Sequence, residues 1–383
     1  MTKLFIENAA ALSPLGASLD EIWSAVMARK TVYGKVSLPG DRSFYAAETR
    51  PGTGSDISVY APLFNDAIRG MVADLGIAEP VDAVFFATAV GNLGQVENEV
   101  YAGRSITLDD LDFAQVEAVF ADTPAWGPET RFVSVPTGCC AGLQATGLAK
   151  AVMERMGIKR AIIMSLDFGL TPLAFEAFHK INATTGYDRS ANASPSRPFC
   201  RNRNGFLFSD GGGAILVSTE QSFPDQPCIS GYGCVSSAYH MTDIATDGDA
   251  IGKSIMLALQ QSGLAGHEIG HVNLHASGTQ QNDEAEYNAL LATLGSDLPT
   301  ITAFKGNHGH ALGGANMIEL ALSWKILREA TIPPTPEHLP IDAYDAVTPR
   351  STPQALDRLS ILKTASGFSG IHASLIMEAS ICA

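Results

Sequence analysis

Two segments in different halves of the sequence constrain the fold more than any other feature. Gly138 begins GCCAGLQATGLAKAV, and Gly309 begins GHALGGANMIELALS. In both, a glycine is followed by side chains that can do chemistry, and then by a helix rich in small residues that allow close backbone packing. We interpret them as matching strand-to-helix junctions of an internal repeat. This places Cys139 and His310 at equivalent helix starts, facing one another across a pseudo-twofold axis.

Short apolar runs alternate with helix-period segments along the chain, which indicates an α/β protein. Strands are expected at residues 4–6, 83–90, 133–135, 161–164, 228–230, 271–274, 301–304 and 372–378. Helices are expected at residues 18–30, 59–76, 139–156, 249–264 and 310–327, the first opening on the capping-box signature SLDE. The polar segment TEQSFPDQP separates the two series, so we expect one half at 1–222 and a second at 223–383.

The composition excludes several classes of protein. A hydrophobic share of 46% with 17% charged residues is typical of a globular protein, not a disordered one. A net charge of −15 argues against nucleic-acid binding. The six cysteines form no CxxC pair, so neither a zinc site nor a redox motif is indicated. We expect a cytoplasmic protein with reduced thiols, no signal peptide, no membrane span and no metal.

The adjacent cysteines Cys139 and Cys140 have two interpretations. The thiolate is the reactive form of cysteine, and a helix N-terminus favours negative charge, so the position suits a nucleophile of depressed pKa. Free cysteine is also among the most frequently buried residues, which favours packing for an isolated pair. The doublet alone leaves both interpretations open.

Other reactive side chains occupy similar junctions. His275 follows a predicted strand directly, and Asp283 and Glu286 lie at the start of the next helix. Lys305 and His310 flank a glycine-bearing turn, and GFSG at 367–370 precedes the last strand. Each has an ordinary structural explanation, but together they supply a nucleophile candidate, two imidazoles and an ammonium on one duplicated scaffold.

The chain resembles the β-ketoacyl synthases of the thiolase superfamily, which are condensing enzymes of fatty-acid and type II polyketide synthesis. The family's motifs occur in order: TGC at 137–139, SRPF at 196–199, NGF at 204–206, AYHMT at 238–242, HASGTQQND at 275–283, KGNHGHALGGA at 305–315 and GFSG at 367–370. The resemblance implies an α/β thiolase fold with five layers, αβαβα, and two pseudo-duplicated halves, each with a mixed five-stranded sheet.

The resemblance also implies roles for individual residues. Cys139 matches the nucleophile that accepts the acyl group, while Cys140 is read as packing. His275 and His310 match the histidine pair, and Lys305 matches the accompanying lysine. Glu286 matches the acidic partner of that lysine, with Asp283 in support. Ser277 and Thr279 match the hydroxyls that hold the phosphopantetheine arm. Phe368 matches the gating residue, and its backbone N–H and that of Cys139 match the oxyanion-hole donors.

The implied reaction is a decarboxylative Claisen condensation of an acyl-Cys139 thioester with a malonyl group. Both groups arrive on acyl carrier proteins, and no metal or organic cofactor is implied. The resemblance implies a dimer, either of identical subunits or with a chain-length factor. Arg197, Arg201 and Arg203 form the densest basic cluster and are expected to dock the acidic carrier. Two alternatives stay open: a non-catalytic, chain-length-factor-like partner, and a Cys-His hydrolase.

The sequence departs from the family pattern at a few positions. Cys200 replaces the usual Asp after Arg-Pro-Phe, and Ser366 and Ser369 replace residues of the GFG-type gate. The family's first HxTxT hydroxyl is Ser277 here. These changes leave the nucleophile and the two histidines in place and concern the gate and the acyl pocket.

Overall fold

The computed structural model describes residues 3–38, 42–50, 60–107, 113–185, 195–336, 344, 347 and 349–379. In this part of the chain, ten strands form one mixed sheet in the order β11-β10-β14-β15-β9-β1-β8-β6-β4-β5. Five come from the first half: β1 (Leu4–Leu12), β4 (Ala83–Thr88), β5 (Arg131–Pro136), β6 (Arg160–Asp167) and β8 (Gly211–Ser218). Five come from the second: β9 (Cys228–Ser236), β10 (His271–Asn273), β11 (Thr300–Thr302), β14 (Ser360–Gly367) and β15 (Ile371–Glu378).

The two sets of strands repeat one pairing pattern. From β1 outward, the successive pairs with β8, β6, β4 and β5 are antiparallel, antiparallel, parallel and parallel. From β9 outward, the pairs with β15, β14, β10 and β11 follow the same sequence. This is the duplicated arrangement of mixed five-stranded halves that the sequence led us to expect. The boundary at residue 222 lies in the β8–β9 connection and stays a prediction.

The resemblance implied a separate five-stranded sheet in each half. In the structure the two sets of strands are joined at the start of β1. There, Leu4 pairs with Ile229 and Phe5 with Cys228. The Ile6 N–H also donates to the Pro227 carbonyl at 2.8 Å. Strand β8 pairs with one edge of β1, and at the start of β1 strand β9 satisfies the backbone groups of the other edge.

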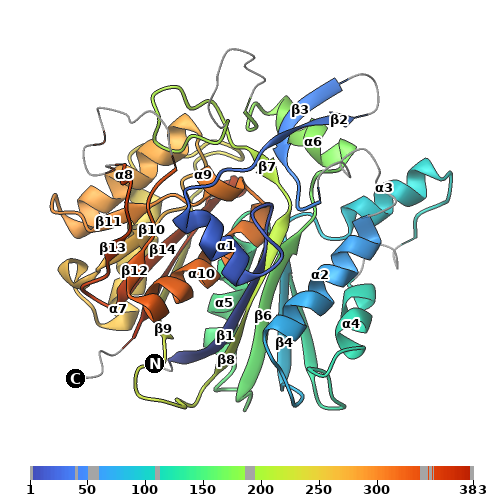
Figure 1. Ribbon diagram of the computed structural model, residues 1–383, viewed down its shortest axis with the longest axis horizontal. Helices are drawn as coiled ribbons and strands as arrows, with labels where there is room; N and C mark the ends of the chain where they lie inside the picture. The colour runs from blue at the N-terminus through green and yellow to red at the C-terminus, as the bar shows by residue number, and fades with distance from the viewer. Residues whose placement is uncertain are drawn as a thin grey trace.

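Helices fill the centre and cover the outer faces (Figure 1). They are α1 (Leu19–Met27), α2 (Tyr60–Asp74), α3 (Leu93–Tyr101), α4 (Ala114–Ala121), α5 (Ala141–Val152), α6 (Pro172–Lys180), α7 (Asp249–Ser262), α8 (Gln280–Leu294), α9 (Lys305–His308) and α10 (Leu312–Glu329). Helices α5 and α10 contact each other between the halves. On the outside, α2 and α4 cover the first half, and α7 and α8 cover the second.

Shorter elements complete the described structure. Strands β2 (Gly34–Leu38), β3 (Arg42–Ala47) and β7 (Phe208–Ser209) form a small sheet, and β12 (Thr331–Ile332) pairs with β13 (Gln354–Ala355). The 3₁₀ turns are η3 (Gly266–Glu268) and η4 (Phe368–Gly370). None of the described helices is both long and apolar enough to cross a membrane.

Close packing of α10 on the sheet explains the glycines of β8. A Cβ on Gly213 would lie 2.6 Å from backbone atoms of Met317, and one on Gly314 of α10 would lie 2.1 Å from the Gly211 carbonyl oxygen. Only glycine therefore lets α10 approach this strand. The tight contact fixes the N-terminal end of α10, and with it the His310 turn, relative to α5.

Candidate active site

A cavity of about 480 Å³ brings together predicted site residues from both halves. Its lining includes Cys139 from the first half and Phe368, His275, His310, Ser277 and Thr279 from the second. Lys305, Glu286, Asp283 and the three arginines are not part of this wall. The structure therefore brings the proposed nucleophile, the two imidazoles and the gate into one pocket.

Cys139 stands at the start of α5, where Cys140 occupies the cap position. The Asn316 amide donates a hydrogen bond to the Cys139 carbonyl, which ties α10 to α5 at this point. Burial raises the pKa of the Cys139 thiol to about 12, and the Asp167 carboxylate adds to the shift, against the opposing charge of Lys305. The expectation of a depressed pKa is wrong for this resting site, because burial outweighs the helix terminus.

Two backbone groups act on the Cys139 sulfur against this rise in pKa. Phe368 and Cys139 both make backbone hydrogen bonds to the thiol group, and both favour its thiolate form. These are the two groups expected to bind the oxyanion of an acyl-transfer intermediate. A carbonyl attached to this sulfur would lie beside donors that are already fixed in place.

The two histidines are buried, neutral and adjacent. The ring centroids of His275 and His310 lie 5.1 Å apart with the planes nearly perpendicular. Burial holds the pKa of each imidazole well below its usual value, and the charge of Lys305 lowers both further. The edge of Phe206 packs against His310 at 4.9 Å. Neutral imidazoles can donate an N–H to a developing anion without placing a charge in the pocket.

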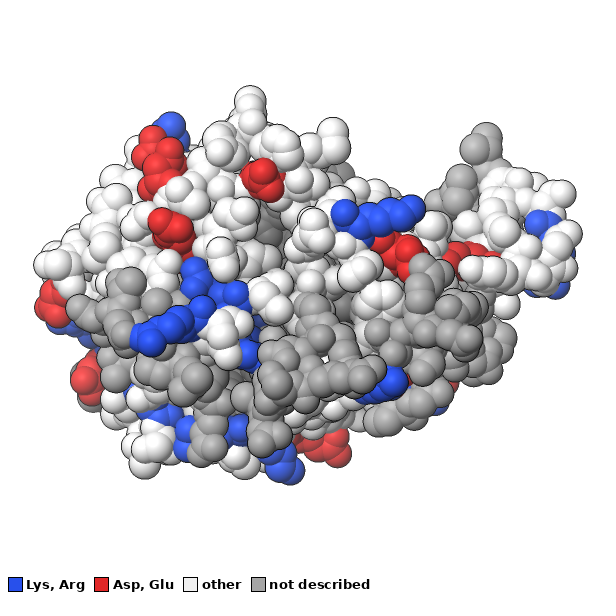
Figure 2. All heavy atoms as spheres, turned by 90° about the horizontal axis from the view of Figure 1, so that it is seen from above, with Lys and Arg blue, Asp and Glu red and all other residues white. Residues whose placement is uncertain are grey.

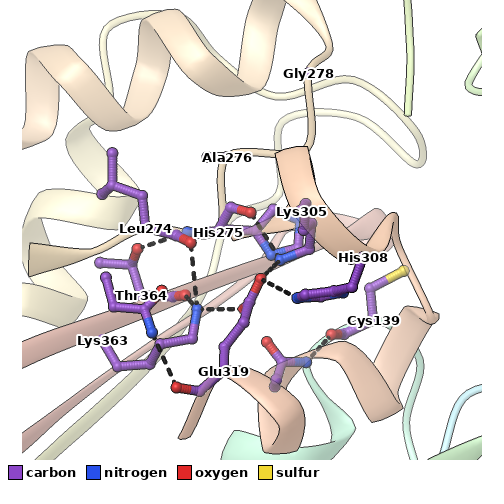
Figure 3. A network of polar contacts seen from close by, with 12 residues as sticks. Cys139, Leu274, His275, Ala276, Gly278, Lys305, His308, Glu319, Lys363 and Thr364 are labelled. Atoms are coloured by element: carbon purple, nitrogen blue, oxygen red, sulfur yellow. Dashed lines mark hydrogen bonds and ion pairs between the residues drawn. The ribbon is translucent and has the colours of Figure 1, made fainter. Parts of the chain in front are cut away.

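The sequence predicted Glu286 as the acidic partner of Lys305. In the structure, Lys305 pairs with Glu319 of α10 instead (Figure 3). The Lys305 ammonium lies 2.6 Å from Glu319 Oε1 and donates to the His275 carbonyl at 2.7 Å. Both side chains are almost completely buried. Lys305 therefore holds the His275 backbone from behind the pocket wall. The acidic partner of Lys305 therefore lies on α10, between the two halves, and not on α8, which covers the outside of the second half.

Glu286 holds the other side of the same peptide. Its carboxylate accepts from the N–H groups of His275 at 2.9 Å and Ala276 at 2.6 Å, and from the Thr364 hydroxyl at 2.6 Å. Ala276 has a φ of +41°, a left-handed conformation that is costly for a residue with a Cβ. Two N–H groups on one carboxylate offset this strain and fix the direction of the His275 side chain.

Ser277 and Thr279 line the pocket as predicted, with their hydroxyl oxygens 3.0 Å apart. Thr279 also caps α8, because its hydroxyl accepts from the Asn282 N–H. Asp283 accepts from the Phe199 N–H at 2.8 Å and the Gly278 N–H at 3.1 Å. The start of α8 therefore supports the loop that carries both hydroxyls.

The turn that carries Phe368, the proposed gate, is held by one aromatic contact and by polar contacts of the serines on either side. Phe368 stacks on Phe178 of α6 at a centroid distance of 6.0 Å. Ser369 adopts a φ of +66°, and its N–H donates to the Met241 carbonyl at 2.6 Å. The departure at Ser366 places its hydroxyl 3.0 Å from His372 Nδ1 across the β14–β15 hairpin. The serines therefore tie the turn to its neighbours.

The arginine cluster is not the exposed docking patch that we predicted. Arg203 is 8% exposed and lies 3.3 Å from the Asp283 carboxylate, where it also donates to three backbone carbonyls. Arg197 is 7% exposed, while Arg201 is exposed. Charge reversal at Arg203 would break a buried ion pair and so disturb folding. Of the three, Arg201 is the exposed one.

Several polar residues around the site were missed. Glu319 and Lys363 stand out in hindsight as charges inside apolar runs, ANMIELALSW and SILKTASG, where a buried charge needs a partner. Asp167 is fully buried and accepts from the Thr88 hydroxyl at 2.6 Å and the Gly314 N–H at 3.0 Å. Nothing in their sequence spacing indicated these partners, since each pairing joins distant elements.

The high thiol pKa predicts how Cys139 reacts with iodoacetamide. Alkylation should be slow near about pH 7 and rise steadily to about pH 9, because the thiolate fraction grows throughout this range. Asp167→Asn should speed alkylation at every pH, since loss of the carboxylate charge lowers the thiol pKa. Mass spectrometry of the Cys139 peptide measures the rate. A wild-type rate that is already constant across this range would contradict the raised pKa.

Comparison with known sequences gives a consistent result. Residues 227–338 match the family model described as "Beta-ketoacyl synthase, C-terminal domain". The chain is 30% identical over 316 residues to a putative polyketide beta-ketoacyl synthase 1 of Streptomyces virginiae, covering 77% of this chain and 74% of that protein. It is 33% identical over 209 residues to 3-oxoacyl-(acyl-carrier-protein) synthase 2 of Mycobacterium bovis, covering 53% and 50% of the two chains.

Solved structures resemble the whole fold. One is a type II PKS ketosynthase bound to a hexaketide and complexed with its acyl-carrier protein, with a TM-score of 0.85, 23% identity and 99% coverage of both chains. Another is the ishigamide ketosynthase/chain length factor, with a TM-score of 0.80, 21% identity and 99% coverage of both chains. These likenesses confirm the thiolase fold expected from the sequence. With the relatives above, they show that the chain belongs to the β-ketoacyl synthase family of the thiolase superfamily.

Proposed function

We propose that this β-ketoacyl synthase uses Cys139, His275 and His310 for the decarboxylative Claisen condensation of an acyl group with a malonyl group. The observation that carries the assignment is the shared cavity, in which a thiol with two backbone donors faces two adjacent neutral imidazoles. A hydrolase needs one base beside its nucleophile, whereas a second neutral imidazole suits a reaction that develops an enolate.

In the first half-reaction, the sulfur of Cys139 attacks the thioester carbonyl of an acyl carrier. A neutral imidazole of the pair takes the thiol proton and passes it to the departing pantetheine sulfur. The backbone N–H groups of Cys139 and Phe368 bind the tetrahedral oxyanion. The acyl group then stays on Cys139 as a thioester.

In the second half-reaction, a malonyl carrier occupies the same pocket. His275 and His310 donate hydrogen bonds to its thioester oxygen, which becomes the enolate oxygen as carbon dioxide leaves. The enolate carbon attacks the acyl-Cys139 carbonyl, and the chain grows by two carbons as the thiolate departs. Ser277 and Thr279 hold the pantetheine arm during this step. The scheme needs no metal or organic cofactor.

The proposed partners follow from this scheme. The substrates arrive on an acyl carrier protein, and the chain works as a dimer, either with a copy of itself or with a chain-length factor. The similar solved structures include a ketosynthase with its acyl-carrier protein and a ketosynthase with its chain length factor, which supports both partner classes. The described cysteines are free thiols, in keeping with a cytoplasmic location.

Incubation with acyl and malonyl carriers tests the proposal. We expect a 3-oxoacyl carrier, with release of one carbon dioxide for each product. Free fatty or polyketide acid formed without any malonyl carrier would indicate the hydrolase alternative. A protein that forms no acyl adduct and no product would indicate a non-catalytic, chain-length-factor-like partner.

Carrier docking can be tested at the exposed cations near the pocket. Figure 2 shows several Lys and Arg side chains on one face, with Asp and Glu among them, although the chain carries a net charge of −15. Arg201 lies three residues before Asn204, and Lys180 directly precedes Ile181; both Asn204 and Ile181 line the cavity. We propose these two cations as docking residues for an acidic carrier.

Arg201→Glu and Lys180→Glu should each raise the KM for the acyl carrier by about tenfold with little change in kcat, since they act on encounter. The effect should shrink at high salt. Lys159→Glu is the matched control, because Lys159 is also exposed but directly precedes β6, whose far end carries Asp167 beside Cys139. Equal KM changes in all three variants would reflect net charge alone and would contradict local docking.

A further inference from the structure

A second fully buried lysine stands behind the histidine pair. Lys363 of β14 lies 2.7 Å from Glu319 Oε2, while Lys305 contacts the other oxygen of the same carboxylate (Figure 3). Both Lys363 and Glu319 are 0% exposed. The Lys363 ammonium also donates to the carbonyls of Thr364 at 2.6 Å and Leu274 at 3.4 Å. It therefore contacts the strand end that carries His275.

Two ammonium groups share this carboxylate. Among the described residues, Glu319 is the acid in ion-pair contact with either ammonium, while the charge of Glu286 acts on Lys363 without an ion-pair contact. Glu286 lies on the α8 side of β14, where it accepts from backbone N–H groups and Thr364. An isolated ammonium in a protein interior costs several kcal/mol, and an apolar residue at 363 would avoid that cost. The second buried lysine at Glu319 therefore needs an explanation beyond stability.

The position of Lys363 suggests its use. Lys305 holds the carbonyl of His275 and Lys363 lies against the carbonyl of Leu274, so both cations stand directly behind the peptide that aims the His275 ring. Negative charge develops on the enolate oxygen in front of that ring during decarboxylation, but not during binding of a neutral acyl group. A fixed cation there stabilises the decarboxylation transition state more than the acyl-transfer step.

We propose that Lys363 is a positioning residue for the decarboxylation half-reaction. It places a second buried positive charge behind His275, and it acts through its contacts with Glu319 and the Leu274 carbonyl. The inference rests on the proposed function. It separates the two half-reactions, because only one of them develops an enolate.

The charge of Lys363 should also help keep the imidazoles neutral. The charges of Lys305 and Lys363 lower the pKa of both imidazoles, while His308 acts on His310 and His372 acts on His275. The other titratable groups beside the pair are Cys139 just before α5, Glu286 of α8 and Glu319 of α10. Loss of one cation from this set raises the imidazole pKa values. Protonation then begins at a higher pH, so the acid limb of decarboxylation moves upward.

Three variants test the proposal. Lys363→Gln removes the charge and keeps a donor, Lys363→Met removes both, and Lys363→Arg keeps the charge. Carbon dioxide release from a malonyl carrier and acyl loading of Cys139 are measured across pH for each. We expect Gln and Met to slow decarboxylation by about tenfold and raise its acid limb, with acyl loading within about twofold of wild type and Arg restoring most of the rate.

Two results would overturn the proposal. One is a folded Lys363→Gln protein with unchanged decarboxylation and an unchanged acid limb. The other is a parallel loss of loading and decarboxylation without any shift of the limb, which marks a purely structural role. If Lys363→Met does not fold, the Gln and Arg variants decide the question. A wild-type protein that neither loads acyl groups nor releases carbon dioxide would instead refute the proposed function.

Discussion

Cys139→Ala should reduce condensation of acyl and malonyl carriers by at least about 10³-fold, because no covalent acyl intermediate can form. Decarboxylation of the malonyl carrier should persist, since both imidazoles and their supporting residues are untouched. The measurement is the formation of 3-oxoacyl carrier and, separately, of carbon dioxide.

Cys140→Ala is the control for this variant. Cys140 is 1% exposed, and its thiol lies against the Ile371 carbonyl, 3.4 Å away and outside the cavity wall. Its loss should leave condensation within a few-fold of wild type and lower stability by about 1 kcal/mol through lost packing. If the two variants had the opposite effects, the nucleophile would be Cys140 and the assignment of the doublet would be reversed.

His275→Ala and His310→Ala should each lower carbon dioxide release from a malonyl carrier by about 10²- to 10³-fold, the usual effect of removing one donor from a charge-stabilising pair. In the wild-type protein, the pKa values of the His275 and His310 imidazoles lie well below the ordinary value for histidine. Both rings therefore stay neutral as the pH falls through about 6.5. The wild-type decarboxylation rate should therefore be nearly constant from neutral pH down through that value, and fall only at lower pH.

His267→Ala is the matched control, since His267 is exposed in the η3 turn and remote from the cavity wall. It should change neither the rate nor the acid limb. A wild-type rate that drops with an apparent pKa of about 6.5 would show that the imidazoles titrate normally, and would contradict their burial as the cause of neutrality.

The sequence predicted the elements that carry chemistry better than the contacts that support them. The helix expected over 139–156 is α5 (Ala141–Val152), and the one expected over 310–327 is α10 (Leu312–Glu329). Small residues at both helix starts and a nearby strand are local signals, so they can be read from one segment. Strand β8 was not predicted, because its GGGA start reads as a loop until α10 packs against it.

The errors concern long-range electrostatics. Spacing suggested Glu286 for Lys305, but Glu286 satisfies backbone N–H groups, and the ammonium reaches Glu319 across the helix layer. The local density of arginines suggested a surface patch, yet Arg203 pairs with a buried carboxylate. The thiol pKa was expected to fall because the helix terminus is visible in the sequence, whereas the burial that raises it exists only in the folded chain.

A single-turnover experiment tests most directly whether one cavity performs both half-reactions. Protein carrying an acyl group on Cys139 is freed of excess acyl carrier and mixed with malonyl carrier, and intact mass and carbon dioxide are followed together. We expect each acyl-enzyme to disappear with formation of one carbon dioxide and one 3-oxoacyl carrier. Loss of the acyl mass as free acid, or carbon dioxide release that leaves the acyl-enzyme intact, would contradict it.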